Sequence, residues 1–142
     1  MAQKAKDTQS REELQKKYME LQLLGHQIKE MQKQVQTIDS QLADLDATNN
    51  ALEELSKTEE KTEMFVPISS GVFASAELKD SKELLVNVGA GTAVKKPISD
   101  VREMIDEQIV ELGNYRLQAL AQLEKLIEHA RKLESELKSL IG

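Results

Sequence analysis

The sequence predicts an α+β fold, in which a long antiparallel two-helix coiled coil carries two β-hairpins between its helices, at its base. Charged residues make up 31% of the 142 residues and aromatic residues only 3%, a composition typical of long helices and coiled coils. Six glycines and two prolines leave long uninterrupted stretches at both ends of the chain. The middle of the chain, residues 62–97, changes to β-branched residues, Ser and Gly, which favour strands and turns.

The first helix is predicted over residues 10–61, after a flexible N-terminal tail over residues 1–9. Ser10 and Glu13 fit an S-x-x-E capping box, which is typical of a helix start. Two series of residues recur every seven positions, and ten of their twelve members are aliphatic, which indicates a coiled coil. The series are Leu14, Leu21, Ile28, Val35, Leu42 and Asn49, and Lys17, Leu24, Met31, Ile38, Leu45 and Leu52.

The second helix is predicted over residues 98–142. One series recurs every seven residues without a break: Ile98, Ile105, Leu112, Ala119, Leu126, Leu133 and Leu140. Its companion series starts as Val101, Gln108 and Tyr115 and then shifts by one residue to Leu123, Ala130 and Leu137. Such a shift is typical of a stutter, which locally unwinds a supercoil.

Two helices of matched length around one short segment are expected to fold back on each other as a helical hairpin. Pairing Leu55 with Asp100 at the base places Leu14 opposite Ile141. Both chain ends then lie together at the far end, the tip of the arm. The same register places His26 opposite His129, the two histidines of the chain.

Residues 62–97 read as two hairpins, the first turning at residues 69–71 and the second at residues 89–91. Pro67 cannot donate to a strand ladder, so its strand is expected at an edge or a bulge. Four short strands with no helix over them leave apolar faces and edges uncovered, so we expect other copies or paralogues to cover them. The predicted oligomerisation residues are Phe65, Val66, Ile68, Val72, Ala74, Ala76, Leu85, Val86, Val88 and Val94.

Several function classes are disfavoured. The absence of cysteine excludes disulfides, thiolate zinc sites and Cys nucleophiles. Two histidines are too few for a metal site, and the acidic residues near the base are expected to form a solvated face, so no catalytic, cofactor or metal site is predicted. A net charge of −6 argues against general nucleic-acid binding. No stretch has the length of a membrane helix and the N-terminus lacks a signal peptide, so we expect a cytoplasmic protein without membrane contact.

One segment resembles a known family. The run from Phe65–Ile68 through Val72 to Ala76, followed by Leu85–Gly91, is similar to the prefoldin family, specifically its archaeal α type. The resemblance implies a heterohexamer of two α and four β subunits, whose hairpins close into a double β-barrel with six coiled-coil arms. It also implies capture of unfolded proteins at the arm tips and their delivery to a group II chaperonin without ATP. Residues 92–96 are more basic and less aromatic than the family's pattern, so strand contacts there are expected to differ.

We expect the client surface at the arm tip, where a two-helix seam leaves apolar side chains partly exposed. The predicted residues are Tyr18, Leu21, Leu23, Leu24, Leu137, Leu140 and Ile141. Lysines and arginines also gather near this end, either as ordinary coiled-coil surface charge or as a contact for an acidic partner. The main alternative function is a coiled-coil scaffold or adaptor without chaperone activity. An RNA-binding arm is a third, which the negative net charge disfavours.

Overall fold

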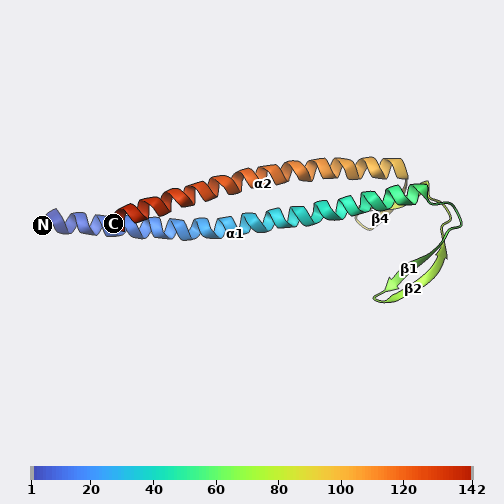
Figure 1. The fold of residues 1–142 in the computed structure, drawn as a ribbon, viewed down its shortest axis with the longest axis horizontal. Coiled ribbons are helices and arrows are strands. Elements are labelled where there is room, and N and C mark those ends of the chain that lie inside the picture. Colours follow the sequence, from blue (N-terminus) through green and yellow to red (C-terminus); the bar gives the residue numbers. More distant parts are fainter. Residues whose placement is uncertain (1, 142) are drawn as a thin grey trace. The chain divides into compact units, whose positions relative to one another are not determined.

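The computed structural model describes residues 2–141. It contains α1 (Ala2–Lys57), β1 (Glu63–Ser69), β2 (Val72–Glu77), β3 (Glu83–Gly89), β4 (Thr92–Pro97) and α2 (Ile98–Ile141), as Figure 1 shows. The strands form two separate antiparallel hairpins, β1–β2 and β3–β4. This order of two long helices with two hairpins between them confirms the predicted fold class. The chain forms two compact units, one built from the residues up to Ser40 and from Gly113 onward, the other from residues 41–112.

The N-terminal tail predicted over residues 1–9 is wrong for the described part, because α1 already begins at Ala2. Ser10 therefore lies inside the helix and not at its start. Residues 2–9 contain no Gly or Pro, and Ala, Gln and Lys are good helix formers, so nothing in this segment ends the helix. The Thr8 hydroxyl donates a hydrogen bond to the Lys4 carbonyl oxygen (2.7 Å), a contact within one helical turn.

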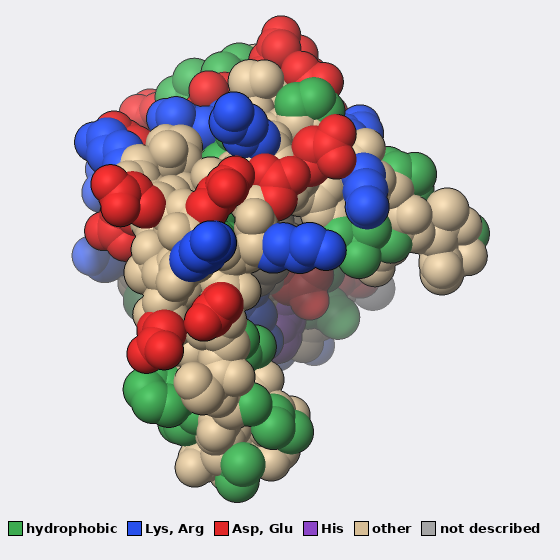
Figure 2. Space-filling model, turned by 90° about the vertical axis from the view of Figure 1, so that its right-hand side faces the viewer, with side chains coloured by type: hydrophobic (Ala, Val, Ile, Leu, Met, Phe, Trp, Pro, Cys, Tyr) green, Lys and Arg blue, Asp and Glu red, His purple; other side chains and the backbone are tan. Residues whose placement is uncertain are grey.

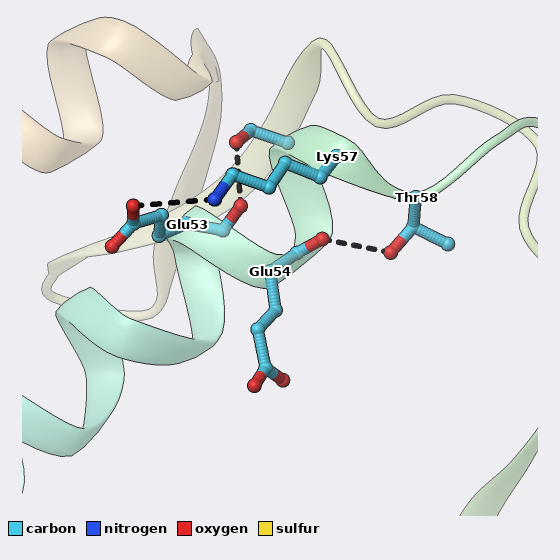
Figure 3. Close-up of polar contacts among 5 residues, drawn as sticks. Glu53, Glu54, Lys57 and Thr58 are labelled. Atoms are coloured by element: carbon cyan, nitrogen blue, oxygen red, sulfur yellow. Dashed lines mark hydrogen bonds and ion pairs between the residues drawn. The ribbon is translucent and has the colours of Figure 1, made fainter.

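The helix α1 ends at Lys57, four residues before the predicted limit (Figure 3). The Lys57 ammonium lies 3.5 Å from a Glu53 carboxylate oxygen, and a cation in the last turn suits the negative end of the helix dipole. The Thr58 hydroxyl donates to the Glu54 carbonyl oxygen (2.8 Å), which satisfies one of the last carbonyl groups. Lys61, with a φ of 69°, then redirects the backbone before β1 begins at Glu63.

Within each unit, α1 and α2 lie side by side and antiparallel, and their apolar residues face each other along a seam. All twelve predicted seam positions of α1 are half-buried or buried, whereas the residues between them are exposed. The predicted heptad register of α1 is therefore confirmed. This agreement follows from a strict seven-residue spacing, which keeps one face of a helix towards its partner.

The predicted seam of α2 needs two corrections: Leu140, at its end, is 43% exposed, and the companion series shifts earlier than predicted. Gln108 and Tyr115 were expected in the seam but are exposed, and Ile109 and Arg116 are less exposed in their place. The shift of one residue therefore comes directly after Val101, two heptads earlier than predicted. Val101 and Ile109 are both four residues from the buried Ile105, so this stretch presents three aliphatic residues on one face and leaves Gln108 in solvent.

Three polar residues at seam positions contact acidic residues of the opposite helix. In the unit of residues 41–112, the Asn49 amide donates to Asp106 Oδ1 at 2.9 Å. In the other unit, Lys17 Nζ lies 3.0 Å from Glu136 Oε2. Arg116 Nε, in the same unit, donates to Asp39 Oδ1 at 2.6 Å. Each polar interruption of the apolar seam is thus matched across the helix pair.

The two hairpins have turns of the same length but different backbone conformation, since Ser70 in the first turn lacks the positive φ of Ala90 in the second. Each has a two-residue connection, and each has a register irregularity just before its turn, between Pro67 and Ser69 in β1 and between Asn87 and Gly89 in β3. In the second hairpin, the turn residues Ala90 and Gly91 both have positive φ values, 53° and 72°. Two consecutive positive φ values are what a type I′ turn requires, and this turn matches the twist of paired strands.

Candidate interaction surfaces

The β1–β2 hairpin exposes apolar side chains on both of its faces. Paired residues share a face, so Phe65 lies on the same face as Phe73, whereas Val66 lies on the other face with Ala74. Phe65 is 75% exposed and Phe73 is 60% exposed. Ile68 and Val72, near the turn, are exposed as well. Figure 2 shows hydrophobic side chains gathered on the projection at the bottom of the view, while acidic and basic side chains cover the part of this face above it.

The β3–β4 hairpin differs, because one of its faces is covered by the chain's own helices. Leu84 and Val86 pack against a core cluster of the buried residues Leu52, Val101 and Ile105. Leu85 points to the other face and is 71% exposed.

Most of the predicted oligomerisation residues are exposed: Phe65, Val66, Ile68, Val72, Leu85, Val88 and Val94. The other three are half-buried: Ala74, Ala76 and Val86. Val86 belongs to the subunit's own packing and is not a free surface residue. The sequence reasoning missed Phe73, although its place opposite Pro67 in an alternating strand puts it on the face of Phe65. It also missed that Leu84 packs on the helices, since alternation alone does not say which face is covered.

The predicted client residues divide into surface and seam. Tyr18 and Leu23 are each 59% exposed, and Leu140 and Ile141 are exposed too. Leu24 and Leu137, in contrast, are buried in the seam, at 5% and 8% exposure, and Leu21 is half-buried. Leu24 was a predicted seam position as well as a predicted client residue, and the structure favours the seam. At this burial, Leu24 and Leu137 offer little surface to a client.

An apolar groove lies where α1 and α2 meet near the C-terminus. Its volume is about 470 Å³, and it is lined by Leu14, Gln15, Tyr18, Met19, Leu137 and Ile141. Leu14 and Ile141 line the same groove, as expected from the predicted register. The sequence reasoning missed Met19, which is 69% exposed. Met19 follows Tyr18 directly and lies outside the heptad seam, and this position could have indicated that it lines the same groove.

The two histidines also meet at one groove, of about 720 Å³, on the same unit. His129 Nε2 lies 3.6 Å from Glu20 Oε1. Among residues 2–141, no three His, Asp or Glu side chains come close enough together to hold a metal ion. The arrangement offers two imidazoles and several lysines but no set of ligands that would fix a cation.

None of the helices in the described part of the chain is long and apolar enough to cross a membrane.

Comparison with known proteins agrees with this architecture. The family model described as "Prefoldin subunit" matches residues 24–142. Prefoldin subunit alpha of Thermofilum pendens is 28% identical over 92% of this chain and 98% of its own length. Prefoldin subunit alpha of Pyrococcus horikoshii is 32% identical, over 89% of this chain and 88% of its own length. Prefoldin subunit alpha of Methanobrevibacter smithii is 31% identical over 78% of this chain and 75% of its own length.

A solved structure has the same fold. A chain of a filamentous PFD from Methanocaldococcus jannaschii, determined by cryo-electron microscopy, superposes with a TM-score of 0.73. The match covers 82% of this chain and 96% of that chain, at 19% sequence identity. Because the family model spans most of the sequence and its curated relatives are alpha subunits, the chain belongs to the prefoldin family of chaperones, as a subunit of the alpha type.

Proposed function

We propose that this subunit captures unfolded proteins at the tip of its helix pair, the end that carries Leu14 and Ile141, and that the assembly delivers them to a group II chaperonin. The observation that carries the proposal is the exposed apolar groove of about 470 Å³ at this end. Delivery to the chaperonin rests on the family resemblance. The role needs no catalysis and no cofactor, and we infer that it is carried out in the cytoplasm.

The chemistry of the groove supports weak and broad binding. Met19 is flexible and polarisable, so it adapts to different apolar side chains. Tyr18 offers a large apolar ring with a polar end, which suits a site that is partly in water. A groove that is this open binds one exposed segment weakly. Several such tips in one assembly would hold a client far more tightly, provided that it reaches more than one tip.

We infer that the hairpins join this subunit to its partners, with β subunits as the complement and two α to four β subunits as the composition. A two-stranded hairpin is marginally stable alone in water, and β1–β2 exposes apolar side chains on both faces. An exposed patch of this kind usually marks a protein interface. The β1–β2 hairpin therefore supports an interface in the assembled state.

The test compares two variants of the full chain in the purified assembly. Tyr18→Ser with Met19→Ser removes two exposed walls of the groove without touching a buried seam residue. Val110→Ser with Leu117→Ser removes two similarly exposed apolar side chains from α2 outside the groove, at 64% and 65% exposure. Aggregation of a chemically unfolded test protein is followed by light scattering, and native mass measurement checks that each assembly is intact.

We expect the groove variant to lose most of its protection and the control to keep it. Equal protection by both variants would move the client site away from the tip. An intact native assembly that never suppresses aggregation would favour the scaffold or adaptor function instead. Delivery is tested separately, by adding a group II chaperonin and ATP to the client-bound assembly and measuring the yield of refolded client.

A further inference from the structure

Cations from both helices line the larger groove, the one of about 720 Å³. Lys29 and Lys33 come from α1, and Lys125 comes from α2. Residues four apart lie on one face of a helix, so Lys29 and Lys33 form one row of the groove. Lys125 and His129 are also four residues apart and form the facing row. The groove is therefore bordered by positive charge on both sides.

These lysines have no anionic partners in the described part of the chain. The ion pairs of residues 2–141 involve Lys17, Lys57, Arg116 and His129, and none involves a lysine of this groove. Of the residues that line the groove, Glu30 alone is acidic. Like charges close together destabilise each other, so an anion placed between the two rows would relieve this repulsion.

The floor of the groove is apolar. Met31 and Leu126 line it, and both are half-buried seam residues. The amides of Gln27, Gln34 and Gln122 add hydrogen-bonding groups. An apolar floor between two cationic rows fits a polypeptide segment that carries carboxylates together with a large apolar side chain.

A nucleic acid fits this groove less well. Single-stranded nucleic acids are held by aromatic side chains that stack on bases and by arginines that stack or pair with phosphates. No Phe, Tyr, Trp or Arg lines the groove, and the imidazoles of His26 and His129 are its only aromatic rings. The net charge of −6 also repels a polyanion at longer range, whereas a short acidic segment needs only local positive charge.

We propose that this groove binds acidic segments of polypeptide. The three lysines pair with Asp or Glu carboxylates, and the apolar floor contacts an aliphatic side chain of the same segment. The site differs in chemistry from the apolar groove at the tip: it selects clients or partner segments by charge. It does not depend on the capture of unfolded protein at the tip, because a short free peptide should bind to it.

The test measures binding of a fluorescent peptide to the full chain in its purified assembly, by fluorescence anisotropy. The peptide repeats two Glu and one Leu. Comparison peptides replace Glu with Gln or Leu with Gly, and an oligonucleotide of equal charge tests the other class of ligand. The groove variant is Lys29→Gln with Lys33→Gln and Lys125→Gln. The charge-matched control is Lys61→Gln with Lys79→Gln and Lys82→Gln, three exposed lysines in the connecting segments, outside the groove and away from the tip.

We expect saturable binding that weakens with added salt, since exposed charge pairs are screened. The groove variant should weaken it about tenfold, the loss expected for three solvent-exposed charge contacts, while the control stays within about twofold. Replacing the same three lysines with arginine should preserve binding. Circular dichroism checks that each variant keeps its helices.

Three results would overturn the proposal. Equal weakening in the groove and control variants would indicate general charge attraction. Binding of the oligonucleotide that depends on the groove lysines and exceeds that of the peptide would assign the groove to nucleic acid. If the intact assembly shows no saturable binding of the peptide, the groove is not a binding site for acidic segments. Each result leaves the aggregation test at the tip unaffected, so the two proposals fail independently.

Discussion

Arg116 Nε donates to Asp39 Oδ1 at 2.6 Å across the helix pair, from a seam position that the sequence pattern assigned to the neighbouring Tyr115. The pairing of these two residues fits the register that places Leu55 opposite Asp100. The contact between Asn49 and Asp106, in the other compact unit, fits the same register. Apolar seam residues can pack in several registers of the two helices, whereas a specific polar contact forms in one register and stabilises it.

The coupling between Arg116 and Asp39 is measurable by a double-mutant cycle. Both side chains are partly exposed, at 39% and 47%, so solvent screens the pair. We expect Arg116→Gln, Asp39→Asn and the double variant to give a coupling of about 0.5 kcal/mol from urea unfolding. The pair Lys57 and Glu53, within one helix, serves as a control with weaker coupling. A coupling near zero would mean that the pair does not hold the helices in register.

Asn49 is expected to reduce stability. Its amide nitrogen donates to Asp106, but its side-chain oxygen Oδ1 is buried and has no hydrogen-bond partner in the described residues. A buried polar atom without a partner costs about 1–3 kcal/mol. Asn49→Leu should therefore raise the free energy of unfolding by about 1 kcal/mol, because Asp106 is exposed and regains water. Thermal unfolding of the Asn49→Leu variant, followed by circular dichroism, measures this change in stability. A lower melting temperature would show that the polar contact outweighs the buried oxygen.

Leu23 and Leu24 provide a matched pair for the division between surface and seam. Leu24 is 5% exposed and Leu23 is 59% exposed, one residue apart on α1. Leu24→Ala should cost about 2–4 kcal/mol of unfolding free energy, because it leaves a cavity in the seam. Leu23→Ala should change it by less than about 0.5 kcal/mol, as is usual at exposed positions. Urea unfolding of both variants measures the two changes in unfolding free energy. Similar losses in the two variants would mean that Leu23 is covered in the assembly.

The sequence predicts the helices and hairpins well because their signals are local and repeated. The α1 seam follows a strict spacing of seven, so every position was predictable. The position of the one-residue shift in the α2 seam was predicted wrongly. Gln108 and Tyr115 continue the seven-residue spacing from Val101, but the residues that are half-buried are Ile109 and Arg116. The start of α1 was less predictable, because Ser10 and Glu13 match a capping pattern although the residues before them have enough helix propensity to extend the helix past it.

The interaction surfaces were less predictable, because they depend on which residues the fold covers. Leu24 and Val86 look like surface candidates in a pattern of alternating or repeated apolar residues. One is covered by the opposite helix and the other packs on the core at Leu52. The basic groove was missed for a related reason: Lys29, Lys33 and Lys125 are far apart in sequence and meet only when the helices pair.

The two hairpins are expected to have different roles. Phe65 and Phe73 are exposed on one face of β1–β2, so replacing both with Ser removes an uncovered apolar face without opening the subunit's core. We expect this variant to dissociate the assembly in native mass measurements while it keeps its helical circular dichroism signal. Assembly at the wild-type mass would show that this face does not form the interface.

Val86→Ser is the matched comparison in β3–β4. Val86 packs against the helices, so this change should first lower the stability of the subunit itself, by about 1–2 kcal/mol. The assembly should stay intact below its lowered melting temperature, because the exposed face of β1–β2 is unchanged. Dissociation of the Val86 variant at full helical signal, with the Phe65 and Phe73 variant still assembled, would reverse the two assignments. The interface would then lie on β3–β4, and the exposed phenylalanines would be free to bind clients.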